Sequence, residues 1–227
     1  MSFFDLVATW QFWLLAAITY PLGLLLWPIA FPVILSYPWA NSENQQEDTA
    51  ILAGSFNPPH YGHYAMLKYL SQRHAKVICV VGCNPNKKYA VTPGQRASLL
   101  RTMFSDLPNV EVRVVTTYIW RYGKKRQCRL FYRGIRTWDK DGKDERSLQI
   151  LNTWGPLILG PTWPIPTHYL EGNPEFNHIS STLIRNLLSS GEGDDSKSVV
   201  RAELVKLVPE SIVDQIMKLY TPKTEEQ

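Results

Sequence analysis

The N-terminal part of the chain contains 37 consecutive residues, Leu6 to Ser42, in which no side chain is charged. About 20 apolar residues are enough to cross the hydrocarbon core of a bilayer. A secretory signal peptide would begin with basic residues and have a shorter apolar run. A buried core helix of this length would be unusual. We therefore expect residues 1–40 to form a membrane segment.

Prolines interrupt this segment at positions 21, 28, 32 and 38. One arrangement is a single span over about Trp10–Leu35, kinked at its prolines. The other is a re-entrant hairpin that turns near Pro21–Gly23 or Pro28–Pro32 and leaves both ends on one side. Non-helical backbone inside a bilayer must be shielded by protein, which disfavours the hairpin in a monomer. The sequence does not indicate which membrane is used or which way the N-terminus points.

The charge is divided unevenly between two parts of the chain. Residues 1–49 carry four acidic and no basic side chains, whereas residues 50–227 carry 24 basic and 16 acidic ones, a net charge of +8. The second part is long enough for one domain with a full core. We expect a polar linker over 41–49, a domain over 50–220 facing the cytosol and a disordered tail over 221–227.

The number and spacing of the cysteines indicate the redox state of the compartment and whether a metal site is expected. Cys79 and Cys83 are four residues apart, which is not the spacing of a redox or zinc pair, and Cys128 leaves an odd count. We expect three free thiols in a reducing compartment. With no cluster of metal-ligating residues in the sequence, we expect no resident metal site.

The body alternates short apolar runs with helical patterns. Predicted strands are Ala50–Ala53, Lys76–Val81, Val110–Val115, Arg129–Tyr132 and His168–Leu170. Predicted helices are Tyr61–Arg73, Pro93–Phe104, Glu145–Trp154, Ser180–Leu188 and Ser211–Leu219. This alternation indicates an α/β fold with a doubly wound, mainly parallel sheet. Ligands of such sheets bind beyond the carboxyl ends of the strands.

The segment GSFNPPHYGH, Gly54–His63, follows the first predicted strand of the body and opens the first helix. Gly54 permits close approach of the backbone. His60 and His63 lie three residues apart at a helix N-terminus, where free N–H groups attract phosphate. Two imidazoles there can donate hydrogen bonds to a polyphosphate.

This segment resembles the signature G-[ST]-F-[DN]-P-x-[HT]-x-G-H of the nucleotidylyltransferase superfamily, which has a Rossmann-like fold. Within it the chain is most similar to phosphopantetheine adenylyltransferases. The resemblance continues in register over about residues 50–220. It extends over the segments Asn84–Tyr89, Thr92–Arg101, Asn109–Val112, Arg133–Arg136, Glu145–Asn152, Ile179–Arg185 and Val208–Leu219.

The resemblance implies a transfer of AMP from ATP to 4′-phosphopantetheine, which gives dephospho-coenzyme A and pyrophosphate in coenzyme A synthesis. The attacking phosphate is already anionic, so catalysis is positioning and charge stabilisation rather than base catalysis. Mg²⁺ is expected to accompany ATP, held largely by phosphates and water. Bacterial members of the family are oligomeric, which makes a homo-oligomer one expectation here.

The resemblance also assigns roles to individual residues. His63, Ser55, Lys87 and Arg136 are the expected catalytic residues. Ser55 would lie between the substrates, Lys87 would hold the incoming phosphate with Lys88 beside it, and Arg133 would face the acceptor. The residues expected around ATP are Gly54, Ser55, Phe56, His60, His63, Gly134, Arg136, Glu145, Ile179, Ser180, Ser181 and Thr182. Asp144 is an alternative to Glu145, because one extra residue separates Glu145 from Arg136 relative to the family.

Two other functions remain open. The first is a nicotinamide- or nicotinate-mononucleotide adenylyltransferase, since those enzymes are similar to this chain at Asn57, His60 and the segment ISSTLIR (179–185). In contrast, the segments NPNKK (84–88) and RGIR (133–136) resemble the pantetheine enzymes. A membrane-tethered nucleotide-binding module without turnover is the second alternative. The filled catalytic positions disfavour it.

Nucleic-acid binding is not expected, because phosphate substrates explain the positive charge and no nucleic-acid module is recognised. Two segments, Tyr118–Gln127 and Asn152–Thr167, lack a clear counterpart in the family. The first is strongly basic, which suits a phosphate-rich substrate, an anionic bilayer surface or a solvated loop. We expect Glu192–Lys197 to be a loop.

Overall fold

The computed structural model describes residues 9–40, 46–83, 89–190 and 194–221. Their strands are β1 (Val33–Leu35), β2 (Gln46–Gly54), β3 (His74–Gly82), β4 (Val110–Val115), β5 (Leu130–Ile135) and β6 (Thr167–Glu171). Their helices are α2 (Trp10–Ala30), α3 (Tyr61–Arg73), α4 (Pro93–Met103), α5 (Ile119–Lys125), α6 (Trp138–Leu159), α7 (Ser181–Ser189), α8 (Asp194–Leu207) and α9 (Glu210–Tyr220). A short 3₁₀ helix covers Pro174–Phe176.

The strands form one parallel sheet in the order β1-β6-β5-β2-β3-β4. The predicted doubly wound parallel sheet is therefore confirmed. The chain runs outward from β2 through β3 to β4 and then returns to β5 on the other side of β2. The strand order reverses between β2 and β5, which is the place where such sheets bind ligands.

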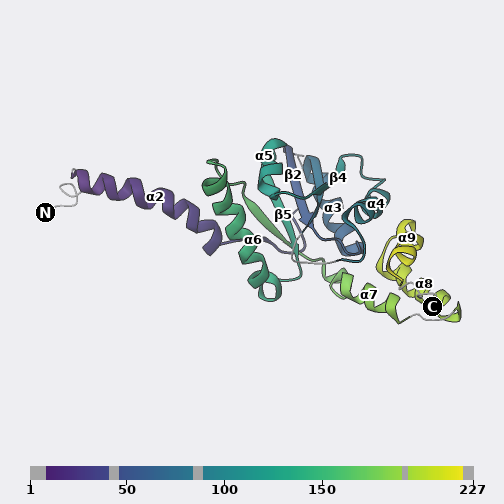
Figure 1. Cartoon of the computed structure of the whole chain (residues 1–227). Coiled ribbons are helices and arrows are strands. Elements are labelled where there is room, and N and C mark those ends of the chain that lie inside the picture. Colours follow the sequence, from purple (N-terminus) through teal and green to yellow (C-terminus); the bar gives the residue numbers. More distant parts are fainter. Residues whose placement is uncertain (1–8, 41–45, 84–88, 191–193, 222–227) are drawn as a thin grey trace.

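Both faces of the central strands are buried, as their continuous apolar runs predict. Ala50 and Leu52 of β2 belong to one core cluster, which also contains side chains of α3, α4, α7, α8 and α9. Ile51 and Ala53 point to the opposite face and share a cluster with Trp120 of α5. Figure 1 shows α7, α8 and α9 at the end of the body remote from α2.

The N-terminal segment differs from the expected arrangement. α2 continues through Pro21 and Pro28 and ends at Ala30, just before Pro32. Val33–Leu35 then joins the sheet as an edge strand beside β6, and β2 begins at Gln46. The expected boundaries at residues 40 and 49 therefore fall within or next to parts of the sheet domain. Residues 33–35 are apolar enough for a membrane segment, but pairing with β6 places them in the sheet.

Hydrogen bonds fasten this segment to the body. The Trp39 Nε1 donates to the Glu171 carbonyl oxygen at 3.1 Å. The Tyr69 hydroxyl and the Arg73 Nη1 each donate to the Ala40 carbonyl oxygen at 3.2 Å. The chain between α2 and β2 is thus part of the folded domain up to residue 40.

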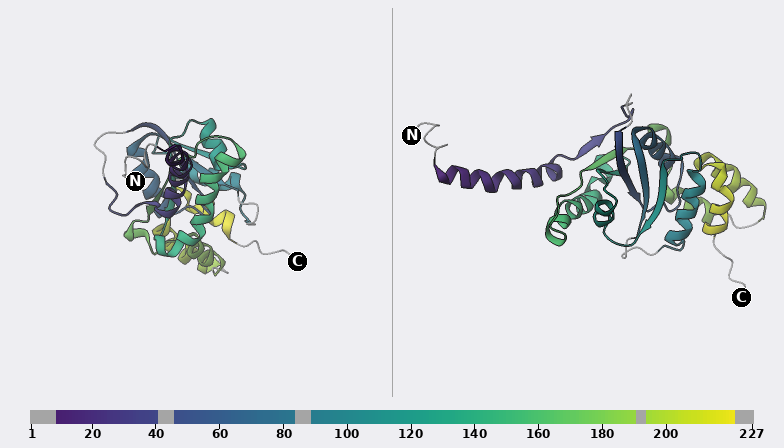
Figure 2. Two further views of the ribbon diagram at one scale, coloured as in Figure 1. Left: turned by 90° about the vertical axis from the view of Figure 1, so that its left-hand side faces the viewer. Right: turned by 90° about the horizontal axis from the view of Figure 1, so that it is seen from above.

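α2 is the one helix in the described part of the chain that is long and apolar enough to cross a membrane. Its 21 residues give a length of roughly 30 Å at a rise of about 1.5 Å per residue. Figures 1 and 2 show it projecting away from the sheet domain. It contacts the body at α6, where Gln149 Nε2 donates a hydrogen bond to the Pro28 carbonyl oxygen.

Three helical regions were not predicted. α5 lies within the basic segment Tyr118–Gln127, for which a solvated loop was one interpretation. α8 begins inside the expected Glu192–Lys197 loop, and α6 extends at both ends beyond Glu145–Trp154. In α6, a side chain at Gly142 would meet the Trp138 ring at 2.9 Å, and one at Gly155 would meet Trp120 at the same distance. Packing of indole rings on these glycines stabilises a helix that local propensity disfavours.

Candidate active site

Two of the predicted motifs, GSFNPPHYGH and RGIR, meet at the carboxyl ends of β2 and β5. β2 ends at Gly54 and β5 at Ile135, and the two strands are neighbours in the sheet. The turn between Gly54 and His60 leads from β2 directly into α3. The predicted clustering of the first motif with the RGIR segment is therefore a consequence of the strand order.

The turn after β2 needs glycine at its start. Phe56 has a φ of +47°, and its ring folds back over Gly54, where a Cβ would lie 2.9 Å from the Phe56 Cζ. The ring also makes an edge contact with His63, with centroids 4.9 Å apart. The Phe56 side chain is buried, so it supports His63 and offers a nucleotide its backbone only.

The two histidines form a unit at the start of α3. His60 is the residue that precedes the helix, and its backbone N–H donates to His63 Nδ1 at 3.2 Å. The ring centroids lie 3.8 Å apart. Because Nδ1 of His63 accepts a hydrogen bond, the neutral ring carries its proton on Nε2. His63 is therefore fixed as an Nε2–H donor.

Burial keeps both imidazoles uncharged at neutral pH. Burial lowers the pKa of His60 to about 4. Burial, and then the neighbouring His60, lower the pKa of His63 well below its ordinary value. Without bound substrate the pair thus supplies hydrogen-bond donors rather than fixed positive charges.

These lowered pKa values predict a dependence of stability on pH. Unfolded histidine titrates near pH 6.5, so protons favour the unfolded chain as pH falls from about 6.5 toward 4. We expect the free energy of unfolding to fall over this window by at most about 1.4 kcal/mol per pH unit for each histidine. Denaturation of the detergent-purified chain and of a His60→Gln variant at pH 7, 6 and 5 measures this. If the free energy of unfolding fell equally steeply with pH in the wild-type chain and in His60→Gln, the prediction for His60 would be wrong.

Three side chains from two helices, α4 and α7, bind the carbonyl oxygens of the turn. Arg96 Nη1 of α4 donates to the Ser55 carbonyl oxygen. Arg185 Nη1 of α7 donates to the Asn57 carbonyl oxygen at 2.5 Å, and Ser181 Oγ donates to the Pro58 carbonyl oxygen at 2.7 Å. With these three carbonyl groups bound by the protein, the turn has a fixed conformation.

The side chain of Asn57 is also held. It is buried, and its Oδ1 accepts a hydrogen bond from the Tyr220 hydroxyl at 2.7 Å. Tyr220 ends α9, the last helix, so the C-terminus of the domain reaches back to the turn after β2. Burial raises the pKa of Tyr220, which keeps its hydroxyl a donor.

Tyr220→Phe should therefore destabilise the domain by about 1–3 kcal/mol, because it leaves the buried Asn57 Oδ1 without its tyrosine donor. Tyr118→Phe is a matched control, since Tyr118 is exposed. Chemical denaturation of both variants measures the difference. Equal stability of Tyr220→Phe and wild type would contradict this role of Tyr220.

The hydroxyl groups of the ISST segment are engaged inside the protein. Ser180 Oγ accepts from the Leu183 N–H at 3.1 Å and caps α7. Thr182 Oγ1 accepts from Arg185 Nη2 at 3.0 Å, and Ser181 Oγ is bonded to the turn. Ile179 is buried. What this segment offers a phosphate is the first backbone N–H groups of α7.

Arg133 and Glu145 form an ion pair with each other. Arg133 Nε and Nη2 donate to the two Glu145 oxygens at 2.8 and 2.7 Å, and Nη1 donates to the Ala53 carbonyl oxygen at 2.6 Å. The Glu145 carboxylate is buried by this pairing, whereas Asp144 is exposed. Three of the five guanidinium N–H groups are used, so two remain for a ligand.

Arg136 lies beyond the end of β5 with its side chain largely exposed. Its backbone N–H donates to Asp141 Oδ2 at 2.6 Å, and its guanidinium pairs with the same carboxylate. This pairing raises the pKa of Arg136. A Cβ at Gly134 would meet the Met66 side chain, with Sδ at 2.6 Å and Cε at 3.2 Å.

The remaining predicted residues are placed as follows. Ser55 is exposed at the turn. Lys87 and Lys88 lie outside the described residues. Within the described part of the chain, no three His, Cys, Asp or Glu side chains are grouped to hold a metal ion.

Sequence reasoning did not assign Arg96, Tyr220 or Asp141 to the site. Arg96 lies in the segment Thr92–Arg101 that resembles the family, so its motif was visible but its function was not. Tyr220 and Asp141 have no local pattern, because only the packing of α9 and the turn into α6 bring them to the site.

Comparison with known proteins matches residues 51–187 to the cytidylyltransferase-like family. A phosphopantetheine adenylyltransferase of Kocuria rhizophila is 30% identical over 158 residues, 69% of this chain and 95% of that protein. One from Leuconostoc citreum is 29% identical over 167 residues, 74% of this chain and 95% of that protein. A solved structure from Vibrio parahaemolyticus, proposed to be a nicotinate-nucleotide adenylyltransferase, has a TM-score of 0.50 at 19% identity and covers 78% of this chain and 98% of its own.

Proposed function

Because the chain belongs to the cytidylyltransferase-like family, we propose that it is an adenylyltransferase that moves AMP from ATP to 4′-phosphopantetheine. The products are dephospho-coenzyme A and pyrophosphate. The observation that carries the reaction class is the partly buried His60–His63 pair at the strand-order reversal between β2 and β5. The acceptor follows from the relatives, several of which are phosphopantetheine adenylyltransferases with 27–30% identity.

The residues divide between the two substrates. His63, through Nε2–H, would donate to the phosphates of ATP at the reacting centre, and the N–H groups that begin α7 would bind further phosphate oxygens. Arg136 would add positive charge there. Ser55 lies at the exposed start of the turn, which suits a position between the substrates. Lys87 would hold the acceptor phosphate.

Arg133 would bind the acceptor with its two unused N–H groups. Glu145 is more suited to orienting Arg133 than to binding the nucleotide, because both of its oxygens accept from that guanidinium. The residue expected at the nucleotide is thus proposed as a positioning residue of the acceptor site.

Mg²⁺ would arrive with ATP as part of the substrate. Phosphate oxygens and water are the ligands that Mg²⁺ commonly keeps in such sites. The ion would neutralise charge on the phosphates of ATP.

A nicotinate or nicotinamide mononucleotide is the second candidate acceptor. It is favoured by His60 together with the ISST segment that begins α7, both of which resemble the enzymes for those acceptors. The NPNKK and RGIR segments, which resemble the pantetheine enzymes, and the curated relatives favour the pantetheine acceptor.

We propose further that α2 anchors the protein in a membrane as a single span, with the catalytic domain on the cytosolic side. The helix is apolar, about as long as a bilayer core is thick, and stands clear of the body. The catalytic domain would then comprise β1 to α9, with α2 as a separate membrane segment.

Pyrophosphate release by the full chain in detergent tests the function. The chain is given Mg-ATP with 4′-phosphopantetheine, nicotinate mononucleotide, nicotinamide mononucleotide or no acceptor. Release of pyrophosphate only in the mixture that contains 4′-phosphopantetheine supports the proposal. Release with a mononucleotide alone would support the second candidate, and ATP binding without release in any mixture would support a module without turnover.

A further inference from the structure

The exposed apolar side chains of the sheet domain are concentrated on one part of its surface. From β2 to the C-terminus, ten large hydrophobic side chains of the described residues are exposed, and six of these lie between positions 148 and 163. We call these six the α6 apolar surface: Leu148, Ile150, Leu151, Ile158, Leu159 and Trp163. Concentrated exposed apolar side chains of this kind mark an interaction surface.

Helical spacing places four of these six residues on one side of α6. Leu148, Leu151, Ile158 and Leu159 share one face, while Gln149 and Thr153 on another face are buried. Two of the six side chains are especially exposed: Ile158 is 71% exposed, and Trp163, just beyond the helix, is 63% exposed.

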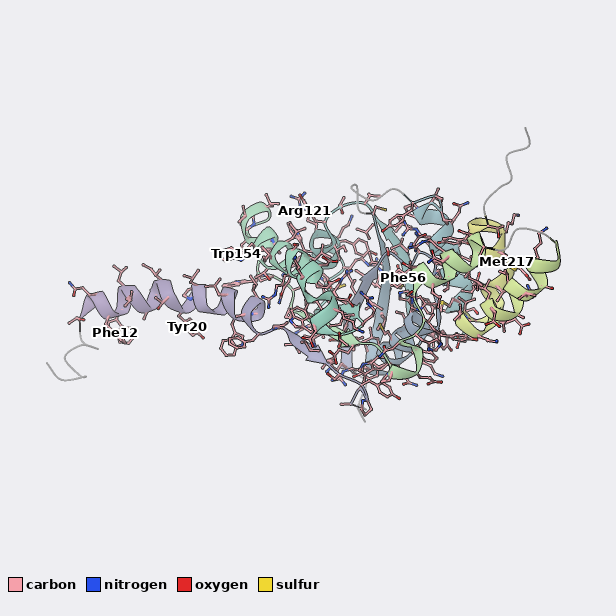
Figure 3. The ribbon with its side chains drawn as sticks, turned by 90° about the horizontal axis from the view of Figure 1, so that it is seen from below. Phe12, Tyr20, Phe56, Arg121, Trp154 and Met217 are labelled. Carbon is pink, nitrogen blue, oxygen red and sulfur yellow. The ribbon has the colours of Figure 1, made fainter. Side chains whose placement is uncertain are left out.

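This surface lies at the end of the body from which α2 projects. α6 is the helix that α2 contacts, through the Gln149–Pro28 hydrogen bond. Figures 1 and 2 agree that α6 lies beside the base of α2. Figure 3 shows Trp154 and Arg121 toward the α2 side of the body, and Met217 of α9 at the far end. A bilayer crossed by α2 would therefore face α6.

Basic side chains border the same surface. Helix α5 carries Arg121, Lys124 and Lys125 and no acidic side chain. Arg121 Nη2 donates to the Leu159 carbonyl oxygen at 3.2 Å, so α5 and the end of α6 are joined. Lys124 and Lys125 of α5 form no ion pair with a described acidic side chain. Indole rings and basic groups around an apolar patch are the composition of surfaces that lie at the level of lipid headgroups.

We propose that the α6 apolar surface and the basic side of α5 rest on the headgroup region of an anionic bilayer, as a second membrane contact beside α2. This contact would fix the orientation of the catalytic domain relative to the membrane. It rests on the proposed span of α2, and the test below separates the two.

The test uses the full chain in lipid nanodiscs, with Cys83→Ser to leave only buried native thiols. An environment-sensitive fluorophore is placed on one new cysteine at a time, by Ile158→Cys, Trp163→Cys or Val199→Cys. Val199 is a matched control, because it is 62% exposed and lies on α8, away from α2. A fourth label, by Tyr20→Cys, reports on the span itself.

We expect the labels at positions 158 and 163 to shift to shorter wavelength and to be quenched by headgroup nitroxide lipids, more in anionic than in neutral discs. The label at 199 should not respond. Quenching of the Tyr20→Cys label by acyl-chain nitroxides, with no response at 158 and 163, would overturn the inference and leave the span intact. No response at position 20 either would overturn both. The labels at 158 and 163 could instead shift to shorter wavelength as protein concentration rises, without being quenched by the nitroxide lipids. That result would overturn the inference and identify a second copy of the chain as the partner of this surface.

Discussion

His63→Ala should lower kcat by about 10²- to 10³-fold, which is the usual cost of losing one preorganised donor to developing charge. His63 has its Nδ1 occupied by the His60 N–H, so its Nε2–H is the group available to the phosphates of ATP. Because this contact is proposed to strengthen in the transition state, the KM values should change little. Steady-state kinetics of pyrophosphate release measure both constants.

His63→Asn is the matched control for this variant. An asparagine Oδ1 lies close to the position of the histidine Nδ1, so it retains an acceptor for the His60 N–H while removing Nε2. If the loss in His63→Ala came from a weakened start of α3, His63→Asn would restore activity. We expect His63→Asn to restore stability and to remain as slow as His63→Ala. A rise in KM without a fall in kcat would contradict the transition-state role.

Arg133→Met should destabilise the domain by about 3–5 kcal/mol, because it leaves the buried Glu145 carboxylate without its partner. The same change should raise the KM for 4′-phosphopantetheine by about 10- to 100-fold, the cost of losing a hydrogen bond to a charged group. Chemical denaturation and kinetics with each substrate varied in turn measure the two effects separately.

The double variant Arg133→Met/Glu145→Leu distinguishes the two consequences. Replacing both charged groups with apolar side chains removes the unpaired carboxylate, so most of the stability should return. The raised KM for the acceptor should persist. A defect confined to ATP in either variant would place Arg133 at the nucleotide instead of the acceptor.

The sequence was informative wherever a local pattern determines local structure. The continuous apolar run at 76–81 predicted β3 with both faces buried, and Pro93 after Thr92 predicted the start of α4, where the structure has a capping box with Gln95. The parallel sheet follows from the alternation of such elements. Because parallel strands end at the same edge, the convergence of the GSFNPPHYGH and RGIR segments was also predictable.

The sequence was uninformative where distant packing decides the outcome. Val33–Leu35 forms an edge strand because β6 offers it a partner, not because its apolar composition differs from that of α2. Glu145 pairs with Arg133 because α6 begins at Trp138, seven residues before the predicted start. The Tyr220–Asn57 hydrogen bond joins residues 163 positions apart, and no local pattern encodes it.

A competition experiment measures which acceptor the protein adenylylates. The full chain receives Mg-ATP labelled at the α-phosphate together with equal concentrations of 4′-phosphopantetheine, nicotinate mononucleotide and nicotinamide mononucleotide, and the adenylylated products are separated and identified. The site described here predicts that the label enters dephospho-coenzyme A, with His63→Asn slowing its formation. Label found chiefly in a nicotinate or nicotinamide dinucleotide would contradict the assignment of the acceptor.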